Sequence, residues 1–133
     1  MAATDVQTKE REAIETAVQQ YIDGASKGDP AKLDQAFHAQ AAMFGSVGGQ
    51  RYDMTIPQLA EMVAGQPLDS DGSFRARITS LEQEGDIARV RLEEDGCWGA
   101  LSFVDYFTLA KVDGVWKIVN KTFTHTGGEL PAG

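Results

Sequence analysis

The segment from Cys97 to His125 constrains the fold more than any other part of the chain. Its sequence, CWGALSFVDYFTLAKVDGVWKIVNKTFTH, alternates apolar and polar residues on both sides of Asp113-Gly114. This pattern predicts two antiparallel strands joined by a two-residue turn. Asp105 lies among the apolar residues of the first strand, where an unpaired carboxylate would be very costly to bury. We therefore expect Asp105 to be hydrogen-bonded, to lie in a cavity that contains water, or to keep its proton through a raised pKa.

The turn also predicts the register of this hairpin. In a regular hairpin, opposed residues share a face, and counting from the turn places Asp105 opposite Thr122 with Asn120 on the same face. This face continues the apolar alternation of the strands, so we expect it to pack against helices. A bulge at residues 110–113 would instead turn Asn120 and Thr122 outward. Three other residues would then come to the inner face: Lys121, Phe123 and His125.

Three helices are predicted before the main strands. Apolar residues recur at helical spacing from near residue 5 to Gly28, which predicts a long first helix. Asp29-Pro30 is typical of the start of a short second helix. Thr55-Ile56-Pro57-Gln58 has the pattern of a capping box and predicts a third helix.

The remaining segments predict a sheet. Residues 38–54 contain Met43-Phe44 and Arg51-Tyr52 on either side of a glycine-rich middle and are consistent with two short strands and a loop. From Phe74 onward, alternation broken by turns predicts four antiparallel strands in sequence. The whole order predicts one α+β domain over residues 1–133, a cone in which the three N-terminal helices pack on a strongly curved, mostly antiparallel sheet.

Composition limits the classes of function. A formal net charge of −8 repels the phosphates of nucleic acids and the surface of anionic membranes, so neither is an expected partner. Cys97 is the single cysteine, which excludes an internal disulfide and a cysteine zinc cluster. The two histidines, His38 and His125, have no clustered acids beside them, so we expect no metal and no cofactor. The N-terminus lacks the features of a signal peptide, and we expect a cytoplasmic protein.

Two segments carry a resemblance to a known fold. YIDGASKGDPAKLDQAF, which runs from the first predicted helix through the second, and DYFTLAKVDGVWKIVNKTF at the end resemble the cone-shaped proteins of the nuclear-transport-factor-two-like superfamily. This superfamily includes the SnoaL-like polyketide cyclases and the steroid delta-isomerases. The ending is most similar to the branch called putative lumazine-binding. The resemblance covers nearly the whole chain and implies the fold, but this fold hosts many unrelated functions.

The resemblance also implies roles for particular residues. Tyr21 matches the oxyanion-hole tyrosine of the isomerases, and Asp105 matches their second oxyanion donor by its place in the strand. The general base of the isomerases corresponds to Gly45, and its neighbours Phe44 and Ser46 carry no carboxylate or imidazole. Half of the isomerase site is therefore present, and the half that moves a proton is missing.

Three functions are compatible with these residues. The first is a small-ligand-binding domain with an apolar cavity for a hydrophobic or aromatic molecule, and four polar residues near its mouth. These four are Tyr21, Asp105, Asn120 and Thr122. The second is an isomerase- or cyclase-type enzyme in which Tyr21 and a protonated Asp105 are the candidate catalytic residues and stabilise an oxyanion. The glycine at residue 45 favours the first function over the second.

The third function is a dimeric partner-binding module. Large side chains are expected on the outer face of the sheet, where they favour a homodimer joined sheet to sheet. The residues expected there are Trp98, Val104, Tyr106, Val119 and Phe123.

Overall fold

The computed structural model describes residues 2–129, with side chains from residue 7 onward. The helices are α1 (Ala2–Lys27), α2 (Pro30–Ala36) and α3 (Ile56–Gly65). The first strands are β1 (Phe37–Val47), β2 (Gln50–Arg51) and β3 (Met54–Thr55). The later strands are β4 (Arg75–Glu84), β5 (Ile87–Cys97), β6 (Leu101–Val112) and β7 (Val115–Gly127).

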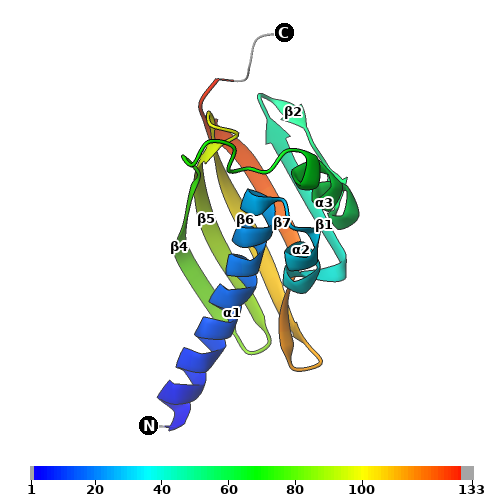
Figure 1. Ribbon diagram of the computed structural model, residues 1–133. Helices are drawn as coiled ribbons and strands as arrows, with labels where there is room; N and C mark the ends of the chain where they lie inside the picture. Colours follow the sequence, from blue (N-terminus) through cyan, green and yellow to red (C-terminus); the bar gives the residue numbers. More distant parts are fainter. Residues whose placement is uncertain (1, 130–133) are drawn as a thin grey trace.

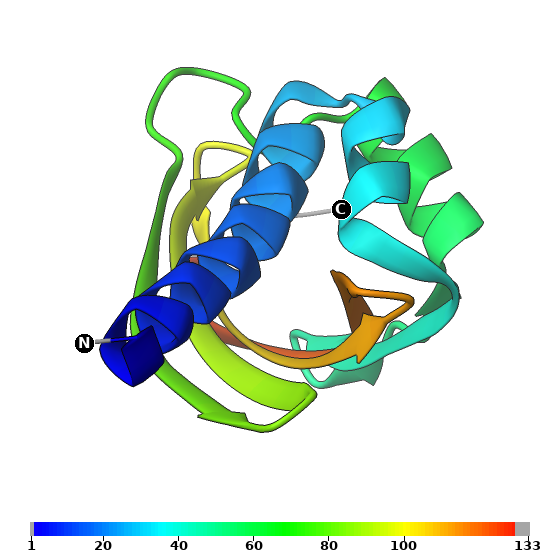
Figure 2. The ribbon, with the colours of Figure 1, turned by 90° about the horizontal axis from the view of Figure 1, so that it is seen from below.

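These strands form one mixed sheet in the order β2-β1-β7-β6-β5-β4, with β3 paired to β1. Only the β1–β7 pairing is parallel among the described strands. The sheet curves around α1, which crosses its concave side, while α2 and α3 lie towards β1 (Figure 1, Figure 2). The predicted α+β class, with three helices on a curved and mostly antiparallel sheet, is confirmed.

The predicted helix boundaries follow from local signals and are largely confirmed. Gly28 ends α1 with φ +68°, a conformation that a side chain would strain. Asp29 caps α2 by accepting a hydrogen bond from the Ala31 N–H at 3.1 Å. Thr55 and Gln58 form the reciprocal capping box that starts α3.

The segment before α3 differs from its prediction. Instead of two short strands, residues 37–47 form a single strand of 11 residues, and β2 and β3 are short additions to it. β1 gains its length by pairing in parallel with β7, a contact between segments far apart in sequence. Such a partner leaves no local pattern in the sequence of β1.

The hairpin begins as predicted and then departs from the regular register. Asp113 and Gly114 both have positive φ, as the expected two-residue turn requires. Leu109 pairs with Ile118, but Thr108 pairs with Asn120, so Val119 has no partner and forms a bulge. Beyond this bulge every side chain of β7 lies on the face opposite to that predicted.

The bulge corrects the prediction for two site residues. Asp105 pairs with Phe123 rather than with Thr122. Thr122 is exposed and Asn120 is half-buried, and neither contributes to the hollow described below. The alternative register that the sequence allowed is the one observed, with the bulge at Val119 instead of at residues 110–113.

Candidate functional site

A hollow of about 680 Å³ lies between the helices and the inner face of the sheet. Most of its wall is apolar and comes from α3, β1, β6 and the segments that follow α3 and β5. Representative wall residues are Met43, Met54, Leu59, Met62, Leu101 and Phe103. A wall of this kind favours an apolar occupant over a polar one.

Four polar side chains in the wall of this hollow form one group, which we call the polar cluster: Tyr21, Glu94, Asp105 and Lys121. Each of the four is buried. The Tyr21 hydroxyl lies 3.3 Å from Glu94 Oε2 and 3.4 Å from Asp105 Oδ2. Lys121 Nζ lies 3.8 Å from Asp105 Oδ1. The cluster thus joins a hydroxyl, two carboxyl groups and an amine in an apolar setting.

Each member reaches the cluster from a different element. Tyr21 belongs to the apolar stripe of α1, and its ring makes edge contacts with Phe37 and Phe107. Asp105 comes from the middle of β6, and its side chain is completely buried. Glu94 lies near the end of β5 and Lys121 lies in β7 beyond the bulge. α1 and three neighbouring strands therefore supply the cluster.

One atom of the cluster lacks a hydrogen-bond partner among the described residues. Asp105 Oδ1 is buried and accepts no hydrogen bond, because Lys121 Nζ at 3.8 Å is too distant for one. Lys121 also lies over two aromatic rings, 4.2 Å from the centroid of Phe123 and 5.4 Å from that of Tyr21. The amine is therefore held by charge and by ring faces, and an acceptor is left open beside it.

Burial shifts the titration of several groups in this wall. It raises the pKa of Glu94 well above the usual range, and the negative charge of Asp105 and a hydrogen bond to it raise it further. Burial and the neighbouring Glu94 raise the pKa of Tyr21, so its hydroxyl keeps its proton. Burial also raises the pKa of the Cys97 thiol, which is then a poor nucleophile. The raised pKa of Glu94 favours its protonated form in the folded chain.

The structure brings two of the four predicted site residues together, namely Tyr21 and Asp105. Glu94 was missed because Glu94-Asp95-Gly96 has the composition of a turn, whereas β5 continues to Cys97. Continuing the alternation of Val90 and Leu92 by one more step would have found it. Lys121 was expected on the inner face only in the alternative register with a bulge, because the bulge at Val119 has no signature of its own in the sequence.

Gly45 has no room for a longer side chain. It pairs with Phe123, and a Cβ atom added at Gly45 would lie 2.3 Å from the Phe123 ring. Gly45, which corresponds to the isomerases' general base, therefore lacks a carboxylate, and the Phe123 ring occupies the space that a side chain would need.

Trp98 and Phe123 were predicted on the outer face, and both predictions are wrong. Both residues line the hollow. Trp98 adopts a positive φ of 53° in the tight connection from β5 to β6, which turns its side chain inward. Its indole donates a hydrogen bond to the Gln66 carbonyl at 3.0 Å, and its backbone N–H donates one to the Leu68 carbonyl at 2.7 Å. Trp98 therefore joins the end of β5 to the segment after α3.

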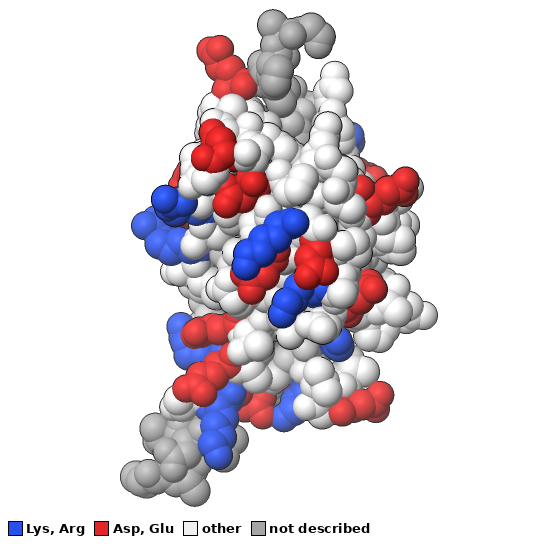
Figure 3. Space-filling view, viewed as in Figure 1, with Lys and Arg blue, Asp and Glu red and all other residues white. Residues whose placement is uncertain are grey.

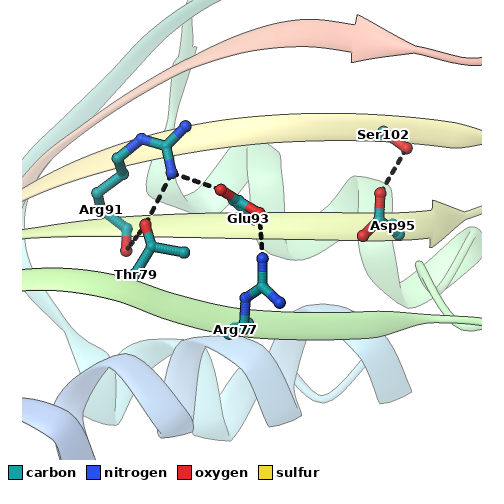
Figure 4. A network of polar contacts seen from close by, with 6 residues as sticks. All are labelled: Arg77, Thr79, Arg91, Glu93, Asp95 and Ser102. Carbon is teal, nitrogen blue, oxygen red and sulfur yellow. Dashed lines mark hydrogen bonds and ion pairs between the residues drawn. The ribbon is translucent and has the colours of Figure 1, made fainter.

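The outer face of the sheet carries a polar network (Figure 4). Glu93 accepts hydrogen bonds from Arg91 at 2.6 Å and from Arg77 at 2.7 Å, and Arg91 also donates to the Thr79 hydroxyl. These hydrogen bonds lower the pKa of Glu93. Tyr106, the large residue predicted on this face, is 59% exposed. The outer face is thus less apolar than predicted, because the aromatic rings of Trp98 and Phe123 line the hollow instead.

Charges on the surface are mixed in sign. On the face shown in Figure 3, basic and acidic side chains lie next to each other instead of forming a patch of one sign. None of the described helices is long and apolar enough to cross a membrane. Within the residues whose side chains are described, no group of three His, Cys, Asp or Glu is arranged to hold a metal ion.

Solved structures and one curated protein are similar to this chain. A protein of unknown function from Shewanella baltica, described as NTF2-like, is 27% identical, with a TM-score of 0.80 and coverage of 91% of this chain and 97% of that one. Another from Methylobacillus flagellatus is 29% identical, with a TM-score of 0.79 and coverage of 90% and 94%. The aldolase FrzH of Cladobotryum is 22% identical over 121 residues, which is 91% of this chain and 95% of that protein.

A family model covers most of the chain. The family is described as "Putative lumazine-binding", and its model matches residues 9–124. This range contains the complete polar cluster and all but the first turns of α1. The chain therefore belongs to the family described as "Putative lumazine-binding", within the NTF2-like, or SnoaL-like, superfamily.

Proposed function

We propose that this chain is a small-ligand-binding domain whose hollow holds a hydrophobic or aromatic molecule with its polar end at the polar cluster. The observation that carries this proposal is a mainly apolar hollow of about 680 Å³ with four buried polar side chains in its wall. Known sites for small molecules combine this order of volume with apolar walls and a few polar groups that orient the ligand.

The cluster defines what the polar end of the ligand needs. Asp105 Oδ1 lacks a donor, and Lys121 Nζ is a donor 3.8 Å away. A ligand N–H or O–H would satisfy Asp105, and a neighbouring carbonyl oxygen would accept from Lys121. Lumazine, the ligand in the family's description, has this pattern, because its ring carries an N–H between two carbonyl groups. It is therefore the first probe to test.

Isothermal titration calorimetry with lumazine, and with naphthylmethanol as a plain aromatic alcohol, tests the proposal. Gly65 lines the hollow, and a Cβ added to it meets no atom within 4 Å, so a side chain can start there and we expect Gly65→Phe to obstruct the hollow and abolish binding. Ala64→Phe is the matched control, because Ala64 is exposed and does not line the hollow. Binding that survives Gly65→Phe, or the absence of binding to the wild type for both probes, would reject the proposal.

An isomerase- or cyclase-type enzyme is the second candidate, and the raised pKa of Glu94 favours it. In this version Glu94 replaces Asp105 as the protonated oxyanion donor beside Tyr21, and the open Asp105 Oδ1 accepts the proton. The aldolase relative, which spans almost the same length, also motivates this candidate.

Exchange of the α-protons of tetralone in D₂O, followed by NMR, measures this chemistry. The wild type should accelerate the exchange, and Tyr21→Phe should slow it by about a hundredfold, the usual effect of losing an oxyanion donor. No acceleration by the wild type would reject the enzyme while leaving the binding domain in place.

We also propose a homodimer through the outer face of the sheet. Tyr106 and Ile87 lie on this face, are each 59% exposed, and would be covered by such a contact. Light scattering should give twice the mass of one chain for the wild type and a monomer for Tyr106→Glu. A monomeric wild type would contradict the dimer.

A further inference from the structure

Lys121 is a primary amine in the wall of an apolar hollow. It is 4% exposed, and its Nζ lies beside the Phe123 ring, the Tyr21 ring and Asp105, which all line the same hollow. Its Nζ makes no hydrogen bond to the described residues, since the one carboxylate beside it is 3.8 Å away. The amine is thus buried and makes no hydrogen bond to the described residues.

Other lysines of the chain differ from it in this respect. Lys111 pairs with Glu10 at 2.5 Å, and Lys117, on the same strand as Lys121, donates to the Gln35 carbonyl at 2.7 Å. Neither lines the hollow. An amine is a nucleophile only when neutral, so the ammonium group of a lysine must first give a proton to a nearby base. Asp105 Oδ1 is such a base for Lys121.

We propose that Lys121 captures aldehydes or ketones in the hollow as a covalent imine, with the apolar part of the carbonyl compound against the hollow wall. This inference rests on the proposed binding function and names a substrate class for the same site. It assigns Lys121 as the nucleophile, Asp105 as the base and Glu94 as the acid.

The proton and electron pairs balance within the cluster. Lys121 gives a proton to Asp105, and its nitrogen lone pair attacks the carbonyl carbon while the C=O π electrons move to the oxygen. That oxygen takes a proton from Glu94, and the nitrogen returns one to Glu94, which leaves a neutral carbinolamine. Asp105 then protonates the hydroxyl, which departs as water while the nitrogen forms the C=N bond. The product is an iminium ion paired with the Asp105 carboxylate, and Glu94 is again protonated.

The surroundings of the cluster favour each step. The Tyr21 hydroxyl contacts both carboxyl groups and can hold the carbonyl oxygen as its charge develops. The rings of Tyr21 and Phe123 stabilise a cation at the nitrogen of Lys121 both before and after capture. The apolar wall limits the water that would hydrolyse the imine.

Reductive trapping tests the inference. The protein is incubated with naphthaldehyde and cyanoborohydride, and the adduct is located by peptide mass spectrometry. We expect a naphthylmethyl group on Lys121 in the wild type and in Lys117→Arg, a control on the same strand outside the hollow. Lys121→Arg keeps the positive charge beside Asp105 but has no nucleophilic amine, so this adduct should be lost.

Naphthylmethanol has the same ring system and no carbonyl group, and its binding separates the two claims. If it binds while no adduct forms on Lys121, or adducts form only on exposed lysines, the covalent inference is overturned and the binding function survives. If neither naphthylmethanol nor lumazine binds and Lys121 stays unmodified, both fail. An adduct on Lys121 that disappears in Lys121→Arg supports the inference directly, even if that variant is less stable.

Discussion

Replacing Glu94 by glutamine tests whether a buried carboxylic acid carries a proton in the polar cluster. Glutamine has almost the same shape and keeps a donor and an acceptor near Tyr21 and Asp105, but it does not titrate. Burial, the charge of Asp105 and a hydrogen bond to it raise the pKa of Glu94 in the folded chain, while its ordinary value is 4.5. The two proteins should therefore differ in how their stability changes with pH.

Proton linkage gives the sign and the slope of this change in unfolding free energy with pH. Below pH 4.5 Glu94 is protonated in both the folded and the unfolded wild type, so its stabilising contribution is complete there. As the pH rises towards the folded pKa, the unfolded chain releases a proton that the folded chain retains. The wild type then loses about 1.4 kcal/mol of unfolding free energy for each pH unit in this window relative to Glu94→Gln. Above the folded pKa the difference becomes constant.

Urea unfolding followed by tryptophan fluorescence, from about pH 4 to about pH 8, measures this difference. Glu93→Gln is a matched control, because Glu93 precedes Glu94 but lies on the outer face (Figure 4). Hydrogen bonds from Arg91 and Arg77 lower the pKa of Glu93, so its contribution is present above pH 4.5 and is lost in acid. Glu93→Gln should thus be less stable than the wild type near neutrality. A difference between Glu94→Gln and wild type that does not change with pH would refute the protonated Glu94.

Three further variants test other parts of the site. Lys121→Met should destabilise the protein by about 3–5 kcal/mol in urea unfolding because it leaves Asp105 buried without a cation; adding Asp105→Asn should recover most of this loss, and additive losses would contradict the ion pair. Gly45→Ala should cost about 1–3 kcal/mol by overpacking against the Phe123 ring; Phe123→Leu should relieve the cost, and an unchanged stability would contradict the close contact. Asn120→Ala should leave the calorimetric binding of lumazine unchanged because Asn120 does not line the hollow; weaker binding would favour the regular hairpin register.

Local signals in the sequence predicted much of the fold. The turn at Asp113-Gly114 and the caps at Asp29 and Thr55 depend on a few neighbouring residues, and all three are observed as expected. The length of β1 was not predictable in this way, because it depends on parallel pairing with β7 about 80 residues later in the chain. Turns and helix caps, which depend on a few neighbouring residues, could be predicted from the sequence. Pairing between strands that are distant in the sequence could not.

The site shows the same division. Asp105 stands out in the sequence because it interrupts an apolar strand, and Tyr21 stands out by its place in the helical stripe and by the family resemblance. Glu94 and Lys121 have no such contrast, since both occur in segments where charged residues are common. Their inward orientation depends on where β5 ends and on the Val119 bulge, which are properties of the assembled sheet.

The charges of the polar cluster give a physical reason for the register that the sequence alone leaves open. A regular hairpin would place Lys121 on the outer face and leave Asp105 and Glu94 as two buried carboxyl groups without a cation, a costly arrangement. The bulge at Val119 brings Lys121 within 3.8 Å of Asp105 and also bends β7, as the curved sheet requires. Curvature and charge balance therefore favour the same register. The polar cluster, which we propose orients a ligand, thus also favours one register of β6 and β7. A one-residue slip between these strands would separate Lys121 from Asp105.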